Sequence, residues 1–141
     1  MGLQMGLMKD YISLISTTDN STLGEVLFIY KLEGVYTESV SGVSVGTDGE
    51  DNSNNTLCIV PYKVKGSSGE TYIKPKAWDA LSLSGKESKY TFREGDIVLI
   101  NQTPVGCKSI EEIKQKYDDC FTIQMIKDFN KVYPHFELIC R

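Results

Sequence analysis

The stretch Glu25-Val-Leu-Phe-Ile-Tyr-Lys-Leu-Glu-Gly-Val35 decides the expected fold class. Val26, Phe28, Tyr30 and Leu32 alternate with their neighbours, so one face of the stretch is wholly apolar and the other only partly so. A period of two residues is typical of a β-strand, because successive side chains point to opposite sides of a sheet. We therefore expect a strand here that packs one face on a core.

Working outward from this stretch, most of the chain has the same strand-like character. Polar or glycine-containing segments at 17–21, 66–69 and 93–96 are expected to be turns. Further strands are expected at 11–16, 35–45, 56–64, 71–74, 90–92, 97–100, 120–126 and 135–140. About eight short strands with one or two short helices predict a mainly β fold, a small β-barrel or sandwich.

The two short helices have recognisable starts. Pro75 suits the first turn of a helix over Lys76–Leu81, in which Trp78 is expected to be buried in the core. Ser109 and Glu112 have the spacing of a capping box, and they predict a helix over 109–118. Its apolar stripe is formed by Ile110, Ile113 and Tyr117.

Length and composition favour one globular domain. The chain has 141 residues, of which 40% are hydrophobic and 24% charged. We expect an N-terminal arm at residues 1–9 and a single β-barrel-like domain at residues 10–141. No apolar run approaches the roughly 18 residues that a membrane-spanning helix needs, so no membrane partner is expected.

The four cysteines stand far apart in the sequence. Cys58, Cys107, Cys120 and Cys140 form no C-x-x-C pair, which argues against a zinc or redox motif. Free thiols are the preferred interpretation, with Cys58 and Cys140 as small core residues in strands.

Charge is distributed unevenly along the chain. Residues 1–61 carry two basic and eight acidic groups, whereas residues 62–93 carry seven basic and three acidic groups. Opposite charges of this kind can be neutralised between neighbouring subunits, or they can form an ordinary solvated surface. The candidate basic strip at a subunit interface consists of Lys63, Lys65, Lys74 and Lys76. Interleaved with Tyr62, Tyr72 and Trp78, it also raises a weaker alternative, a single-strand nucleic-acid-binding barrel.

The stretch 46–55 contains no apolar residue to anchor it, and we expect a flexible polar loop there. Its acidic residues are Asp48, Glu50 and Asp51, whose spacing does not fit a calcium-binding loop. The sequence therefore predicts no metal site in the loop.

Motifs for catalysis are weak throughout the sequence. His135 is the single histidine and has no marked partner nearby, and Gly42-Val-Ser-Val-Gly46 has the letters of a nucleophile elbow without the helix that should follow it. Glu94 and Asp96 are interpreted as residues of a solvated turn rather than a catalytic pair. We expect no enzyme activity, no cofactor and no small-molecule substrate.

A series of short motifs, in a fixed order, gives a resemblance that covers roughly residues 10–141. In sequence order the motifs are Leu32-Glu-Gly-Val35, Gly42-Val-Ser-Val45, Thr56-Leu-Cys-Ile-Val-Pro61, Tyr72-Ile-Lys-Pro-Lys-Ala-Trp78, Glu94-Gly-Asp-Ile-Val-Leu99, Phe121-Thr-Ile-Gln-Met-Ile-Lys-Asp128 and Pro134-His-Phe-Glu-Leu138. With this order the chain resembles small proteins from the head–tail gene modules of long-tailed phages and prophages of Gram-positive bacteria. The segment 106–119, which carries the capped helix, departs from the pattern and takes no function from it.

The resemblance implies a structural protein of the virion head–tail junction, made in the host bacterial cytoplasm. A head-closure (stopper) or connector protein of this kind forms a ring with copies of itself. The ring lies below the portal and adaptor proteins, closes the channel for passing double-stranded DNA, and docks the tail proteins. On this hypothesis the acidic loop is a candidate channel gate, through Asp48, Glu50 and Asp51. A tail terminator and a minor capsid protein of the same junction stay open as alternatives.

Overall fold

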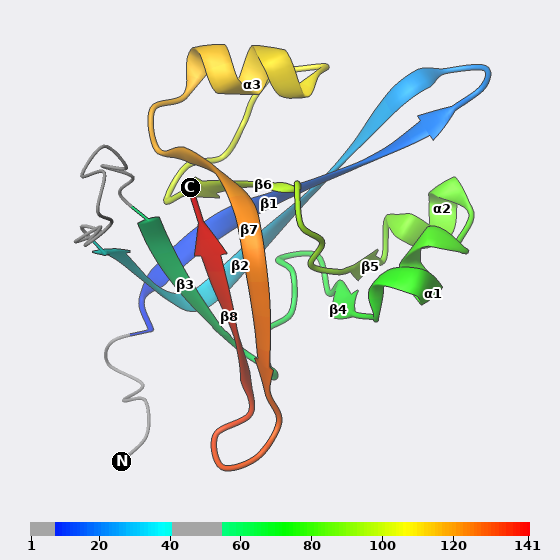
Figure 1. Ribbon diagram of the computed structural model, residues 1–141. Helices are drawn as coiled ribbons and strands as arrows, with labels where there is room; N and C mark the ends of the chain where they lie inside the picture. Colours follow the sequence, from blue (N-terminus) through cyan, green and yellow to red (C-terminus); the bar gives the residue numbers. More distant parts are fainter. Residues whose placement is uncertain (1–7, 41–54) are drawn as a thin grey trace, which may run out of the picture.

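A computed structural model describes residues 8–40 and 55–141, and its centre is a closed barrel of six antiparallel strands in the order β1-β2-β3-β8-β7-β6 (Figure 1). The mainly β fold with short helices is therefore confirmed. Within the described part of the chain, no helix is both long and apolar enough to cross a membrane. The elements are β1 (Asp10–Asn20), β2 (Gly24–Val40), β3 (Asn55–Pro61), β4 (Thr71–Tyr72), α1 (Pro75–Asp79), α2 (Leu83–Lys86), β5 (Lys89–Tyr90), β6 (Ile97–Ile100), α3 (Ile110–Lys116), β7 (Cys120–Phe129) and β8 (His135–Cys140).

β1 and β2 form a long hairpin whose far end projects from the barrel in Figure 1. The turn predicted at residues 17–21 is wrong in its position, because Thr17 to Asn20 continue β1 and pair with β2 up to Gly24. The side chain of Asn20 explains the later turn: its Oδ1 accepts hydrogen bonds from the backbone N–H groups of Thr22 and Leu23, both at 2.9 Å.

β2 is a single strand of 17 residues where the sequence pattern suggested two. Its first part pairs with β1, and its last part, Tyr36–Val40, pairs with β3. The pairing with β1 shifts register between Asp10 and Tyr11, opposite Gly34, which has a φ of +83°. A register shift of this kind bends a strand, so β2 passes from one side of the barrel to the other without a break.

The barrel interior and the segment between β3 and β6 share one hydrophobic core. Trp78 from α1 is fully buried, as the sequence predicts, and Tyr90 and Phe92 pack in the same cluster. The predicted turn at Gly66–Gly69 is present, with the Gly69 N–H donating to the Gly66 carbonyl at 2.8 Å. The strand after it, β4, pairs in parallel with β5, and α2 lies between them as an additional turn of helix that the sequence did not suggest.

α3 covers the outer face of β1 and β6. Ile113 is fully buried against Ile15, Ile97 and Leu99, whose side chains point out of the barrel. The Ser109 hydroxyl accepts from the Glu112 N–H at 3.2 Å, as the capping box predicts. The Glu112 carboxylate, however, accepts from the N–H of Lys108, one residue before Ser109, at 2.7 Å. A second, smaller core therefore lies outside the barrel wall.

Replacing Trp78 with alanine is expected to lower the free energy of unfolding by about 3–5 kcal/mol, because a fully buried indole leaves a large cavity. Urea denaturation followed by circular dichroism measures this, since Trp78 is the single tryptophan and its fluorescence is lost. Leu23→Ala is the control, because Leu23 is 66% exposed, and its change should stay within about 0.5 kcal/mol. Equal midpoints for the two variants would contradict the assignment of Trp78 to the core.

Candidate assembly surface

Of the candidate site residues singled out in the sequence, the structure describes the four lysines but not the three acidic residues. Asp48, Glu50 and Asp51 lie outside the described residues. The four lysines are exposed and fall into two pairs. Lys63 and Lys65 follow β3, whereas Lys74 is the N-cap residue of α1 and Lys76 lies within that helix.

The first lysine pair borders a surface hollow of about 310 Å³. The lining of this hollow includes the Glu33 side of β2 and does not include Lys74 or Lys76. The hollow therefore brings together one pair of the predicted strip. Its role at a subunit interface stays a prediction. The hollow is lined by Met8, Glu33, Gly34, Pro61, Lys63, Val64 and Lys65.

The aromatic residues between these lysines do not form an exposed stacking surface. Tyr62 is 39% exposed, but its ring packs on Phe136 with centroids 4.9 Å apart. The Tyr72 ring is half-buried and lies 4.6 Å from the same Phe136 ring, and Trp78 is fully buried. A nucleic-acid platform needs aromatic faces open to bases, and the fully buried Trp78 offers none.

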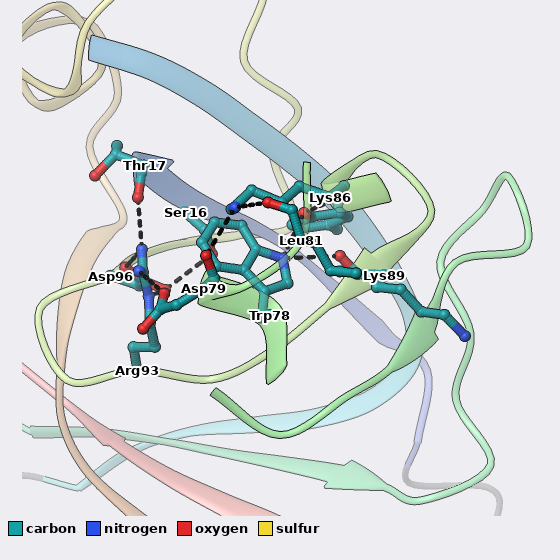
Figure 2. A network of polar contacts seen from close by, with 10 residues as sticks. Ser16, Thr17, Trp78, Asp79, Leu81, Lys86, Lys89, Arg93 and Asp96 are labelled. Carbon is teal, nitrogen blue, oxygen red and sulfur yellow. Dashed lines mark hydrogen bonds and ion pairs between the residues drawn. The ribbon is translucent and has the colours of Figure 1, made fainter. Parts of the chain in front are cut away.

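Arg93 and Asp96 are the centre of a polar network between the turn before β6 and β1 (Figure 2). The guanidinium donates to both Asp96 carboxylate oxygens, at 3.2 and 3.1 Å, and to the Thr17 carbonyl of β1 at 2.8 Å. The buried Ser16 hydroxyl donates to the same carboxylate at 2.8 Å. The network thus ties the turn before β6 to the edge of β1. Burial is the main influence on the Asp96 carboxyl and raises its pKa, although Arg93 opposes this.

The indole of Trp78 lies beside two cations in the same region. Arg93 Cζ lies 4.5 Å and Lys86 Nζ 4.9 Å from the ring centroid. The indole N–H lies within hydrogen-bond distance of the Tyr30 hydroxyl (3.1 Å) and the Lys89 carbonyl (3.0 Å). Tyr30 donates in turn to the Lys86 carbonyl at 2.5 Å, and burial raises the pKa of Tyr30 to about 12. Both cations therefore help to hold α1 against the barrel.

Lys86 is buried and has no ion pair with any described residue; its ammonium donates to the Asp79 and Leu81 carbonyls at the end of α1. Cations near a helix C-terminus neutralise its unpaired carbonyl groups. The polar groups of this network satisfy one another, and we interpret the network as an anchor for the segment between β3 and β6.

The sequence-based interpretation of Asp96 needs correction. We expected a solvated turn residue, but Asp96 is only 7% exposed and bonds to Arg93 and Ser16. Its neighbour Glu94 is exposed, as expected. Turn residues look alike in sequence whether they face water or a neighbouring strand, and it is the position of β1 beside this turn that buries the carboxylate.

The single histidine lies at the start of β8. Its ring stacks on Phe129 with centroids 4.9 Å apart. One ring nitrogen of His135 is 2.7 Å from the Tyr133 carbonyl and the other is 3.1 Å from the Glu137 carboxylate. Both nitrogens are engaged in contacts within the β7–β8 hairpin. Across the described ranges 8–40 and 55–141, no group of three or more His, Cys, Asp or Glu side chains could hold a metal ion.

The outer face of β3, β8 and β7 is a feature that the sequence did not single out. Leu57 of β3 pairs with Ile139 of β8, which pairs with Met125 of β7. Their inward-pointing neighbours, such as Cys58 and Leu138, belong to the core. Because side chains alternate along a strand, the row Leu57–Ile139–Met125 points away from the barrel.

This row continues toward the end of the β7–β8 hairpin. Met125 is 48% and Phe129 42% exposed, and Val132 at the tip is 83% exposed. The outward apolar residues of β7 are hard to find in sequence because the pairing with β8 shifts between Ile123 and Met125. After this shift both Met125 and the inward-facing Ile126 are apolar, so the simple alternation of a half-buried strand is lost.

These observations define a small closed β-barrel protein with one outer face covered by a helix and another outer face that no described helix covers. The chain belongs to a family of unknown function, DUF6751, whose match covers residues 9–141. No curated protein and no solved structure matches the chain significantly. The family match thus spans all the barrel strands and the capped helix α3.

The Asp96 carboxyl is expected to titrate above its ordinary value of 3.8, because burial disfavours its charged form. The folded state then binds this proton more tightly than the unfolded state. The stability that Asp96 gains from this tighter proton binding is fully present below pH 3.8, and it is lost as the pH rises through the pKa of Asp96 in the folded state. Carbon-13 NMR of the carboxyl group measures the shift directly.

The linked stability measurement uses Asp96→Asn beside Glu94→Gln, a change at the exposed carboxyl of the same turn. Free energies of unfolding are compared as pH rises from 3.8 upward. In the wild type the free energy of unfolding should fall with rising pH as Asp96 titrates, and in the Asp96→Asn variant this fall should be absent. The variant should also have a constant loss in its free energy of unfolding, because the ion pair with Arg93 is broken. An Asp96 titration below 3.8 would show that the Arg93 pair outweighs burial.

Proposed function

We propose that this chain is a structural protein of the head–tail junction of a long-tailed phage or prophage, and that it forms a ring below the portal and adaptor proteins. In this role the ring closes the DNA channel after packaging and gives the tail its docking platform. The observation that carries the proposal is the fixed order of seven short motifs between Leu32 and Leu138, which resembles the small head–tail proteins of such phages.

The barrel geometry supports this role because a ring subunit needs a rigid body with two different contact surfaces. A subunit that contacts its neighbours through two distinct patches generates a closed ring when the rotation between copies closes. The closed strand order gives a rigid wall, and the wall has outer faces of different composition.

The charge and the aromatic placement support passage of double-stranded DNA without sequence recognition. The net charge is −4, and phosphate binding depends on clustered cations. Of the three aromatic residues of the basic stretch, Trp78 is buried in the core and not available for base stacking, and the half-buried Tyr72 packs against that core. A negatively charged channel protein repels the DNA backbone, which helps the duplex to slide through.

Deleting this gene from the phage or prophage that encodes it is expected to give empty or leaking heads beside free tails of normal length. Heads that cannot be closed lose their packaged DNA, while tails assemble separately. Negative-stain electron microscopy of the lysate shows both particle types, and supply of the wild-type gene from a plasmid should restore tailed, DNA-filled virions.

Two other outcomes would contradict head closure. DNA-filled heads with tails of irregular length would assign the chain to the tail terminator instead. Intact tailed virions from the deletion strain would remove the chain from the junction altogether.

A further inference from the structure

Cys58 of β3 and Cys140 of β8 form a pair of thiols inside the barrel. In the antiparallel ladder Cys140 pairs with Thr56 and Cys58 pairs with Leu138, so the two cysteines are diagonal neighbours on the same face. Both belong to the hydrophobic core and are fully buried. Diagonal neighbours lie farther apart than direct partners, yet the two thiols are joined by a hydrogen bond. The fold therefore places in contact two sulfur atoms that are far apart in the sequence.

Both cysteines are free thiols in the structure. We propose that they are a redox-sensitive pair, which a hydroperoxide oxidises to a disulfide that joins β3 to β8. The step is argued from the barrel alone. Only its occasion, the release of a virion from a reducing cytoplasm, rests on the proposed function.

A hollow at one end of the barrel gives a small oxidant a short path to the pair. It has a volume of about 220 Å³, and its lining includes Thr37 of β2 and Thr56 of β3. Thr37 is the direct partner of Cys58, and Thr56 is the direct partner of Cys140. Directly opposite residues share a face of the sheet. The hollow thus reaches the residues that lie beside each of the two thiols, and hydrogen peroxide is small enough to enter it.

The oxidation balances with one molecule of hydrogen peroxide. The first cysteine attacks the peroxide, the O–O bond breaks, and a sulfenic acid and one water are formed. The second thiol then attacks the sulfenic sulfur, the S–S bond forms, and the sulfenic oxygen leaves in a second water. Each sulfur has lost one electron, the peroxide has gained two, and both thiol protons are in the waters. Because the second thiol is already in contact with the first, it captures the sulfenic acid before a further oxidation.

The surroundings of the pair make this reaction slow. The hydrogen bond with Cys140, together with burial, raises the pKa of the Cys58 thiol well above its usual value. The thiolate is the form that attacks a peroxide, so little of the reactive form is present at neutral pH. The pair is therefore expected to stay reduced in a reducing compartment and to oxidise only on prolonged exposure to peroxide.

The bond makes one contact of the barrel wall covalent. β8 lies between β3 and β7 in the closed strand order, and Cys140 is its last residue. Closing the S–S bond brings the sulfur atoms from hydrogen-bond contact to about 2 Å, and the end of a strand can make this approach. A cross-link between distant positions also restricts the unfolded chain. The oxidised protein should therefore resist unfolding better than the reduced protein.

Treatment of the purified full chain with hydrogen peroxide tests the proposal. The variant Cys107→Ala/Cys120→Ala serves as the background, because it removes the two half-buried thiols and leaves the pair. Mass spectrometry after alkylation in denaturant should show the loss of two hydrogen atoms and no alkylated thiol. Peptide mapping should place the bond between Cys58 and Cys140. The urea midpoint should rise on oxidation and return to its first value with dithiothreitol.

Cys58→Ala and Cys140→Ala, each in the same background, are the matched controls. Each keeps one thiol of the pair, so neither should form an internal bond or gain a higher midpoint on oxidation. If one of them does not fold, peptide mapping of the wild-type chain still decides.

Three results would overturn the proposal. They are two unmodified thiols after a treatment that oxidises Cys107 and Cys120 in the wild type, a sulfinic or sulfonic acid in place of the disulfide, and a bond from the pair to Cys107 or Cys120. The outcome is separable from the proposed function, because mass spectrometry reports the bond and the deletion lysate reports the role. A mapped disulfide together with intact virions from the deletion strain would retain the thiol pair and reject the head–tail role.

Discussion

The continuity of β2 is the constraint on which the rest of the structure depends. This strand pairs with β1 along its first part and with β3 along its last, so it is the covalent link between the two sides of the barrel wall. A straight strand cannot serve both partners in a small barrel, and the shift opposite Gly34 supplies the bend. Once β2 is bent, Phe28 and Tyr30 of its first part face Trp78. The anchor for the segment between β3 and β6 thus depends on the same strand.

The sequence predicted the parts of this fold that depend on local pattern. Alternation over Glu25–Val35 identified β2, Ser109 and Glu112 identified the start of α3, and Pro75 identified α1 with Trp78 in the core. These features are decided by neighbours in the chain. Features decided by distant strands were missed: Thr17 and Thr18 read as turn residues until their pairing with β2 is known, and Asp96 reads as solvated until β1 lies beside it.

The same distinction applies to the candidate surfaces. The lysine strip was proposed from charge along the chain, yet the hollow beside the β3 end is lined by Lys63 and Lys65 and not by Lys74 or Lys76, which belong to the start of α1. The outer face of β3, β8 and β7 is invisible to such reasoning, because Leu57, Ile139 and Met125 come from three strands and meet only through register. A register shift in β7 further hides Met125 from a search for alternation. Surfaces assembled across strands therefore need the topology before they can be recognised.

The arrangement of helices around the barrel links the fold to assembly. A six-stranded barrel has more outward-facing positions than a chain of this size can cover, and apolar positions that stay open favour association. This chain uses α3 to cover β1 and β6, and among the described elements no helix covers the wall of β3, β8 and β7. Association through that wall would remove the exposed side chains of Met125 and Phe129 from water.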